Sequence, residues 1–361
     1  MSFWQSVSDE NPYIRPILYY QNSMRYTLTV LIVLLFHGGF IIAQIDNSFS
    51  QGLAKLNEQK YAEALTLFDQ AIQSDASNAK AYYNRGICKT ELKDFSGAVA
   101  DFSEYIAKEN TADDKAYFSR AQANYSAQNK EAALNDYLEA GRKNAANSEA
   151  FYYAGGIYFE QNRYDESVDA FSKAIAANND FAEAFHDRGS AKQKKQDLQG
   201  AADDYRQAAK LKPTLVVAYV NLSNVLRAQG DLQGALVELG FAIKVNPKFS
   251  DGYVKRGRIK YELQDYEGAL ADMNKAIEVN ANNYYAFNNR GCVKNKLRDY
   301  KGAIEDFNQS LSLSPDYSYA FLNRGIANEN LNNTTAACSD WSEASKRGLA
   351  AAQTFLDSDC K

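Results

Sequence analysis

Small and large apolar residues recur along the chain with a period of 34 residues. At nine places a small residue precedes a large one by four positions, and successive places are 34 residues apart except for one step of 35. The small residues are Ala64, Ala98, Ala133, Ser167, Ala201, Ala235, Ala269, Ala303 and Ala337, and the large ones are Phe68, Phe102, Tyr137, Phe171, Tyr205, Leu239, Met273, Phe307 and Trp341. A fixed period of this length indicates a stack of repeated units.

Each unit has the spacing of two helices. Tyr253, Gly257 and Tyr261 fall on one face of a first helix, and Ala269 and Met273 fall on one face of a second. Twelve residues before each small residue of the second helix lies another small residue, namely Gly52, Gly86, Ala121, Gly155, Gly189, Ser223, Gly257, Gly291 or Gly325. We expect the two helix backbones to come closest there, with the large rings beside them. One hairpin cannot bury its apolar face alone, so the sequence predicts stacked hairpins.

A helix-turn-helix unit of 34 residues with small residues at its eighth, twentieth and twenty-seventh positions resembles the tetratricopeptide repeat of exported bacterial proteins. The twenty-seventh positions include Ala71, Ala140, Ala174, Ala208, Ala242, Ala276 and Ala344. The resemblance implies an all-α, right-handed α-solenoid of about nine repeats over residues 45–351, with a C-terminal cap within 346–361. The repeats start near residues 45, 79, 114, 148, 182, 216, 250, 284 and 318, and positions are counted from these starts.

An arginine and an aspartate sixteen residues apart recur at the seventh and twenty-third positions. The pairs are Arg85 with Asp101, Arg120 with Asp136, Arg188 with Asp204, Arg256 with Asp272, Arg290 with Asp306, and Arg324 with Asp340. Repeats one and four lack both partners, and repeat six keeps only an acid, Glu238, opposite Leu222. Joint presence and absence indicates that the two side chains meet, because a half-buried charge without its partner is costly. We predict structural ion pairs, within a hairpin or between adjacent repeats, in preference to a ligand site.

The N-terminal region contains an apolar run without a charged residue, Tyr26–Ile42. A basic residue precedes it and Ala43 ends it, which is typical of a secretory signal peptide cleaved after Ala43. A start at Met24 would make residues 24–43 the signal peptide and residues 1–23 a non-native or disordered extension. The alternatives are an uncleaved membrane anchor and a buried core helix. Both leading interpretations place the rest of the chain outside the cytoplasm, so we expect an exported protein that is periplasmic or envelope-associated.

Four cysteines occur without a CxxC pair or a zinc-like spacing. Cys88 and Cys292 lie near the small positions of first helices, where we expect them to pack. Cys338 lies in the last repeat and Cys360 follows a predicted final helix over residues 349–356. Because thiols oxidise outside the cytoplasm, we predict a disulfide between Cys338 and Cys360 that fastens the cap. Two free thiols are the alternative.

The composition argues against several classes of function. The chain has 40 Lys and Arg against 45 Asp and Glu, a net charge of −5, which argues against nucleic acid as a partner. His186 is the one histidine after the candidate cleavage site, so no multi-histidine metal site can form there and a His-based triad would need this residue. The sequence has no GxxxxGK, GxSxG or HExxH motif. We expect neither an enzyme nor a cofactor, and we expect His186 to be an ordinary surface residue.

In the family that the chain resembles, the first helices line a concave groove that holds an extended peptide or a partner's helix. The matching positions give Phe49, Tyr83, Phe118, Tyr125, Tyr152, Phe159, Lys194, Arg227, Arg258, Tyr261, Tyr285, Lys296 and Tyr319. The sixth position adds an asparagine, such as Asn289, that would hydrogen-bond a peptide backbone. Aromatic and arginine side chains often dominate binding energies, and the basic members favour an acidic peptide. Packing between repeats is the alternative role for the tyrosines.

These observations predict a protein–protein interaction scaffold that binds a protein or peptide partner in its groove, with no nucleic acid and no cofactor. The alternative is a structural or assembly subunit of a cell-envelope complex that uses the convex face or the ends of the solenoid. Membrane contact is expected only if residues 26–45 remain as an anchor.

Overall fold

The computed structural model describes residues 39–109 and 111–360, in which the chain forms nineteen helices and no strand. The first helices of the repeats are α1 (Gly39–Asn57), α3 (Ala79–Glu91), α5 (Asp114–Ser126), α7 (Ser148–Glu160), α9 (Ala182–Lys194), α11 (Val216–Ala228), α13 (Ser250–Glu262), α15 (Tyr284–Lys296) and α17 (Ser318–Asn330). The second helices are α2 (Tyr61–Ser74), α4 (Phe95–Lys108), α6 (Lys130–Lys143), α8 (Tyr164–Ala177), α10 (Leu198–Leu211), α12 (Leu232–Val245), α14 (Tyr266–Val279), α16 (Tyr300–Leu313) and α18 (Thr334–Lys346). A last helix, α19 (Ala351–Asp359), follows.

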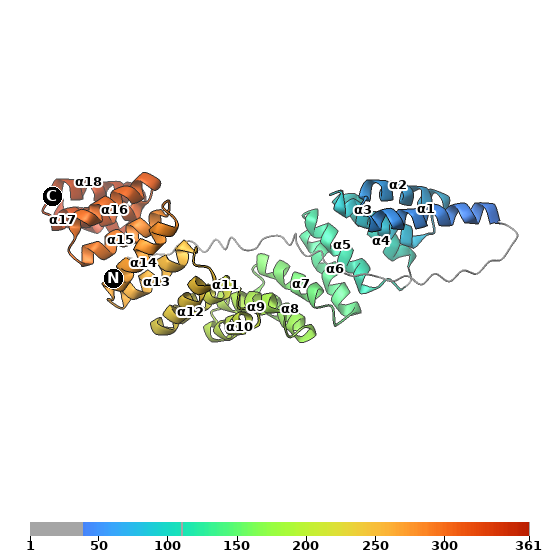
Figure 1. Cartoon of the computed structure of the whole chain (residues 1–361), viewed down its shortest axis with the longest axis horizontal. Coiled ribbons are helices and arrows are strands. Elements are labelled where there is room, and N and C mark those ends of the chain that lie inside the picture. The colour runs from blue at the N-terminus through green and yellow to red at the C-terminus, as the bar shows by residue number, and fades with distance from the viewer. Residues whose placement is uncertain (1–38, 110, 361) are drawn as a thin grey trace.

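The helix pairs stack in chain order into an elongated, twisting array (Figure 1). Each helix packs against the next one in the sequence. First helices also contact the first helices of neighbouring repeats, for example α13 with α15 and α15 with α17. The first helices therefore form the inner layer of the array and the second helices form the outer layer. The predicted all-α solenoid of helical hairpins is confirmed.

The N-terminal predictions fall largely beyond what the structure describes. The extension over residues 1–23 and most of the candidate signal or anchor segment lie outside the described residues. Helix α1 begins at Gly39 and continues through Ala43, the predicted end of that segment. In the part of the chain that the structure describes, no helix is both long enough and apolar enough to cross a membrane.

The eighth and twenty-fourth positions bring the two helices of a hairpin together. A Cβ atom placed on Gly291 would lie 2.6 Å from the ring of Phe307, and one placed on Gly86 would lie 2.8 Å from the ring of Phe102. The two rings are fully buried, with 0% and 1% of their surface exposed. A larger residue at either glycine would push the rigid ring and the helix behind it, which accounts for the small residues at this position.

The turn between the two helices uses the same backbone conformation in every repeat. Its fifteenth position has a positive φ of 59–65° in eight repeats, at Gln59, Lys93, Gln128, Asn162, Gln196, Gln264, Arg298 and Asn332. Repeat six has a glycine there, Gly230, with φ 86°. Non-glycine residues adopt this region at a modest energetic cost, so the turn is set by the packing of the two helices and not by a local glycine preference.

Two glycine substitutions test this close approach. Gly291→Ala should lower the free energy of unfolding by about 1–3 kcal/mol, because the added methyl group overpacks against Phe307. Gly156→Ala is the matched control, because nothing lies within 4 Å of its Cβ position in helix α7. This change should be neutral or stabilise the protein by up to about 1 kcal/mol through helix propensity. Urea unfolding followed by circular dichroism measures both, and equal effects of the two variants would contradict the packing argument.

Candidate functional site

The structure brings the arginine and the aspartate together in all six repeats that carry both. Arginine Nη2 lies 2.5–2.7 Å from aspartate Oδ1. Arginine Nε lies 2.8–3.0 Å from Oδ2 of the same carboxylate. The six aspartates are 2–6% exposed. This two-point contact is the strongest form of an arginine–carboxylate bond, and it joins the first helix of a hairpin to the second.

A third residue, four positions after the arginine, completes each of these contacts. It is a lysine in four repeats, Lys89, Lys192, Lys260 or Lys294, whose Nζ lies 2.8–2.9 Å from the aspartate Oδ2. In repeats three and nine it is Asn124 or Asn328, whose amide donates to Oδ2 at 3.2 Å. We call the arginine, the aspartate and this third residue the clamp. Of the three repeats that lack the ion pair, repeats four and six carry Tyr158 and Leu226 at this position, whereas repeat one carries Lys55.

In five repeats the clamp arginine also reaches the repeat before its own. Its Nη1 atom donates to the twenty-fifth residue of that repeat at 2.6–3.2 Å, pairing Arg85 with Asp69, Arg120 with Ser103, Arg188 with Ser172, Arg290 with Asn274, and Arg324 with Asn308. In repeat seven the corresponding residue of the preceding repeat is Gly240, which offers no side chain. The clamp therefore connects helices within a hairpin and also connects neighbouring repeats, so both predicted geometries occur together.

Repeat six shows what happens without the arginine. Glu238 occupies the aspartate position opposite Leu222, which is 1% exposed. Burial raises the pKa of Glu238 above its ordinary value, and the charge of Arg206 only partly opposes this shift. In the clamps, by contrast, the hydrogen bonds that arginines such as Arg120 and Arg256 donate to their aspartate raise the pKa of the guanidinium group.

The predicted groove aromatics are half-buried and in contact with other rings. Tyr83 packs on Phe102 and Tyr105, with ring centroids 5.5 and 5.0 Å apart. The same kind of contact holds Phe49, Phe118, Tyr152, Phe159, Tyr261, Tyr285 and Tyr319. These are the contacts of side chains that pack between helices, the alternative role considered for them. Each ring is therefore only partly exposed to a ligand.

Side-chain hydrogen bonds link neighbouring first helices across this inner layer, and we call each link a rung. Four rungs run from the fifth position of one repeat to the sixth of the next, namely Tyr83–Ser119, Tyr152–Asp187, His186–Asn221 and Asn288–Asn323, at 2.7–3.3 Å. Two run from the twelfth position to the thirteenth, namely Tyr125–Glu160 and Arg227–Glu262, at 2.7 and 2.6 Å. The rungs were not predicted, although partners 35 or 36 residues apart, about one repeat plus one residue, were visible in the sequence.

Two predictions about the inner layer are wrong. His186 is 7% exposed, with Nδ1 2.8 Å from Asp187 and Nε2 3.0 Å from Asn221, so it is not an ordinary surface residue. Asn289 is 5% exposed, so its amide is not open to a peptide in the groove. Both residues lie on first helices, where the next repeat covers part of the face that the hairpin alone would leave open.

The four basic residues predicted for the groove have three kinds of surroundings. Arg227 forms a two-point contact with Glu262 and is therefore already paired. Lys194 and Lys296 are exposed at the ends of their helices. Burial lowers the pKa of Arg258, and the nearby positive charge of Arg227 lowers it further. The positive character of the inner layer is therefore concentrated on the middle and C-terminal repeats.

The cysteines take two roles. The Sγ atoms of Cys338 and Cys360 lie 2.00 Å apart with their Cα atoms 5.7 Å apart, which places a disulfide between α18 and the end of α19. Formation of that bond in the cell stays a prediction. Cys88 is buried and Cys292 half-buried, and burial raises the pKa of their thiols to about 11 and about 12. Both thiols are therefore protonated at neutral pH and unsuited to nucleophilic attack. Within the described ranges, no group of three or more His, Cys, Asp or Glu is arranged to hold a metal ion.

Comparison with known proteins agrees with this geometry. Models of the tetratricopeptide repeat match residues 49–115, 182–215, 250–283 and 284–317, and a model described as a TPR repeat matches residues 155–196. Together these matches cover more than half of the chain. The chain belongs to the tetratricopeptide repeat family, whose fold is a scaffold for protein–protein interaction.

Individual relatives are distant. The DnaJ homolog subfamily C member 7 proteins of Homo sapiens and Mus musculus are each 33% identical over 92 residues, which is 26% of this chain and 18% of theirs. The chain thus spans less than a fifth of the length of these curated relatives. The C-terminal part of a TPR repeat-containing protein from Cytophaga hutchinsonii is 16% identical, with a TM-score of 0.61 over 67% of this chain and 98% of that one. This likeness shows the fold alone.

A set of clamp variants in repeat eight tests the energetic role of the clamp. Asp306→Ala should lower the free energy of unfolding by about 3–5 kcal/mol, because it leaves Arg290 and Lys294 without their carboxylate. The triple variant Arg290→Ala, Lys294→Tyr, Asp306→Ala copies the residues that repeat four carries and should lose less than Asp306→Ala alone. Guanidinium unfolding measures both variants. A larger loss in the triple variant would show that the clamp contributes more than the cost of stranded charges.

Proposed function

We propose that this protein recognises an extended, acidic peptide or a partner's helix along its inner layer of first helices, outside the cytoplasm. One observation carries the proposal: the clamps and the glycine–ring contacts repeat along the chain, whereas the exposed residues of the inner layer differ from repeat to repeat. Lys194 and Lys296, for example, stand where repeats six and seven have Ala228 and Glu262. A constant scaffold with a variable inner surface suits recognition of one particular partner.

The charges of the inner layer support an acidic ligand. Arg258 and Lys296 lie on α13 and α15, first helices that contact each other. Charge-assisted hydrogen bonds from arginine and lysine to carboxylates are roughly twice as strong as neutral ones. The exposed parts of half-buried rings such as Tyr261 add apolar contact beside these charges. An acidic peptide with apolar side chains therefore fits this part of the groove better than a basic one.

Selection from a displayed random-peptide library on residues 44–361 tests the proposal. We expect acidic sequences to be enriched, and Arg258→Gln with Lys296→Gln to weaken their binding about tenfold or more. Arg227 is left intact, because its loss would strand Glu262. Gln309→Ala, an exposed position on the outer helix α16, is the control and should bind as the parent does. Enrichment of basic sequences, or equal weakening by Gln309→Ala, would refute the acidic groove.

A second candidate function rests on an apolar stripe on the outer helix α12. Val237, Phe241 and Val245 are 56%, 45% and 38% exposed there. The position of Phe241 is occupied in the other eight repeats by Gln70, Glu104, Glu139, Lys173, Gln207, Lys275, Gln309 and Glu343. Such a stripe favours an assembly subunit that binds through its convex face. The two functions can be told apart by capture of a protein from envelope extract. If Phe241→Ser abolishes the capture and the double variant Arg258→Gln, Lys296→Gln does not, assembly through the convex face replaces peptide recognition as the proposed function.

Export is the remaining part of the proposal. It is supported by the apolar segment before Ala43 and by the two cysteines held together at the C-terminal cap, since disulfides persist in oxidising compartments. Intact-mass analysis of the protein from its native cells should give the mass of residues 44–361 less two hydrogens. Reduction should then destabilise it by roughly 3 kcal/mol, as the entropy model gives for a loop of about 22 residues. An unprocessed, fully reduced chain would overturn export.

A further inference from the structure

The chain builds a binding place for an ammonium group four times within its own clamps. In repeats two, five, seven and eight the lysine Nζ lies 2.8–2.9 Å from the aspartate Oδ2. In three of these repeats Nζ also lies 3.2–3.5 Å from a backbone carbonyl at the nineteenth position, of Gly97, Gly268 or Gly302. A buried carboxylate held by an arginine therefore accepts a second cation in this fold without further change.

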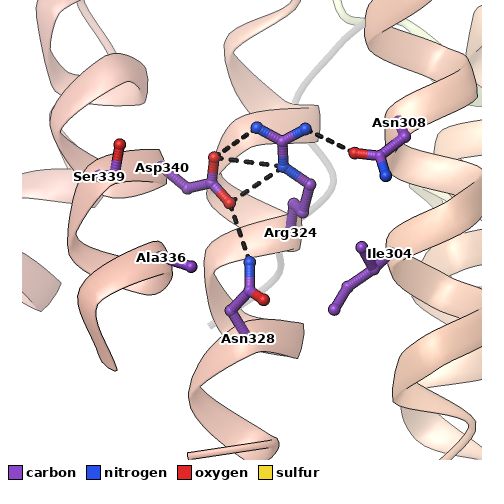
Figure 2. Close-up of a pocket in the computed structure, with 7 residues that line it drawn as sticks. All are labelled: Ile304, Asn308, Arg324, Asn328, Ala336, Ser339 and Asp340. Carbon is purple, nitrogen blue, oxygen red and sulfur yellow. Dashed lines mark hydrogen bonds and ion pairs between the residues drawn. The ribbon is translucent and has the colours of Figure 1, made fainter. Parts of the chain in front are cut away.

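Repeat nine has the same clamp without the lysine. Asn328 takes its place and donates to Asp340 Oδ2 at 3.2 Å, while Arg324 donates to both carboxylate oxygens. Asparagine is shorter than lysine, and a hollow of about 330 Å³ lies at this point between α16, α17 and α18. Figure 2 shows Asn328 and Arg324 converging on Asp340, with Ala336 and Ile304 on either side of Asn328.

The hollow has a charged floor and an open rim. Asp340 and Asn328 are 5% and 8% exposed, whereas Asn308, Ala336 and Ser339 are exposed at the surface. Ala336 occupies the nineteenth position, the residue whose carbonyl the lysine approaches in repeats two, seven and eight. The side chain of Ile304 supplies an apolar wall. An entering group would thus pass a rim of mixed polarity and meet a carboxylate at the end.

We infer that this hollow binds a primary ammonium group on an alkyl stem, and that its ligand is a lysine side chain of a partner protein. Asp340 Oδ2 accepts from Arg324 Nε and, at 3.2 Å, from Asn328, so an entering ammonium group takes the place of the Asn328 hydrogen bond, as the lysine does in four other clamps. The hollow corresponds in position to the lysine of four other repeats, so the ligand replaces a side chain that this repeat lacks. A divalent metal ion fits less well, since Asp340 is the single carboxylate among the lining residues.

This site is separate from the proposed groove. Its residues come from the outer helices α16 and α18 and from the face of α17 that carries the clamp. A lysine inserted here would therefore fix a partner against the C-terminal end of the outer layer. The inference holds whether or not the inner layer binds an acidic peptide, and variants of the two sites can be made independently.

Ligand-observed saturation-transfer NMR on the full-length protein tests the inference, with n-butylammonium and a lysine-containing tripeptide as probes. Both should bind, and the neutral analogue n-butanol should bind about tenfold more weakly or not at all. Asn328→Lys restores the residue of the other repeats, fills the hollow and should abolish both signals. Gln309→Ala, at an exposed position of α16 that does not line the hollow, is the control and should leave them intact. Circular dichroism checks that each variant is folded.

A second variant blocks the hollow without changing a clamp residue, so that a loss of binding cannot come from a change in the clamp itself. Ala336→Phe covers the rim without touching the clamp and should also reduce binding about tenfold. Unchanged binding in both Asn328→Lys and Ala336→Phe, or equal binding of n-butanol, would overturn the site. A response to n-butylammonium without any response to the lysine tripeptide would overturn the assignment to a partner's lysine and identify a small amine as the ligand.

Discussion

The buried aspartate of the clamp is the constraint on which the solenoid depends. A carboxylate that is 2–6% exposed is stable only if its charge and its lone pairs are satisfied. The arginine and the third residue of the clamp do this from the first helix, and the arginine's remaining nitrogen reaches the preceding repeat. One charged contact thus joins the two helices of a hairpin and, in five repeats, joins the hairpin to the preceding one.

Repeat six shows that apolar packing can replace the clamp, with consequences nearby. Leu222 and Leu226 take the places of the arginine and the third residue, and both join the largest apolar core cluster of the described residues. The acid that remains, Glu238, has its pKa raised by burial. Gly240 removes the side chain that Arg256 would otherwise reach. The junction between repeats six and seven therefore depends on apolar contacts and on the partly exposed Arg227–Glu262 rung, a contact that salt weakens.

The fold could be predicted from the sequence because nine repeats place small, large and charged residues at the same positions. The period, the hairpin and the glycine–ring contact all follow from positions within one repeat, and so did the pairing of arginine with aspartate. The third clamp residue recurs as lysine or asparagine at the eleventh position of the same six repeats, so the sequence carries a signal for it as well. His186 and Asn289 were misplaced for a different reason. Their burial depends on side chains of the neighbouring repeat, and no pattern within a single unit specifies what the next unit places over them.

The rungs also determine what the inner layer can recognise. Tyr125, Tyr152 and Arg227 each donate a hydrogen bond to a carboxylate of the next repeat. A ligand that bound their polar atoms would therefore have to break a hydrogen bond between two first helices. Such a ligand would gain little binding free energy, because the charge-assisted hydrogen bond that it breaks offsets the one that it forms. If the inner layer binds the proposed peptide, recognition would therefore fall to the exposed parts of the rings and to exposed helix ends such as Lys194 and Lys296, while the rungs would hold the first helices in one arrangement. A groove that is already ordered loses little conformational entropy on binding, which favours affinity from few contacts.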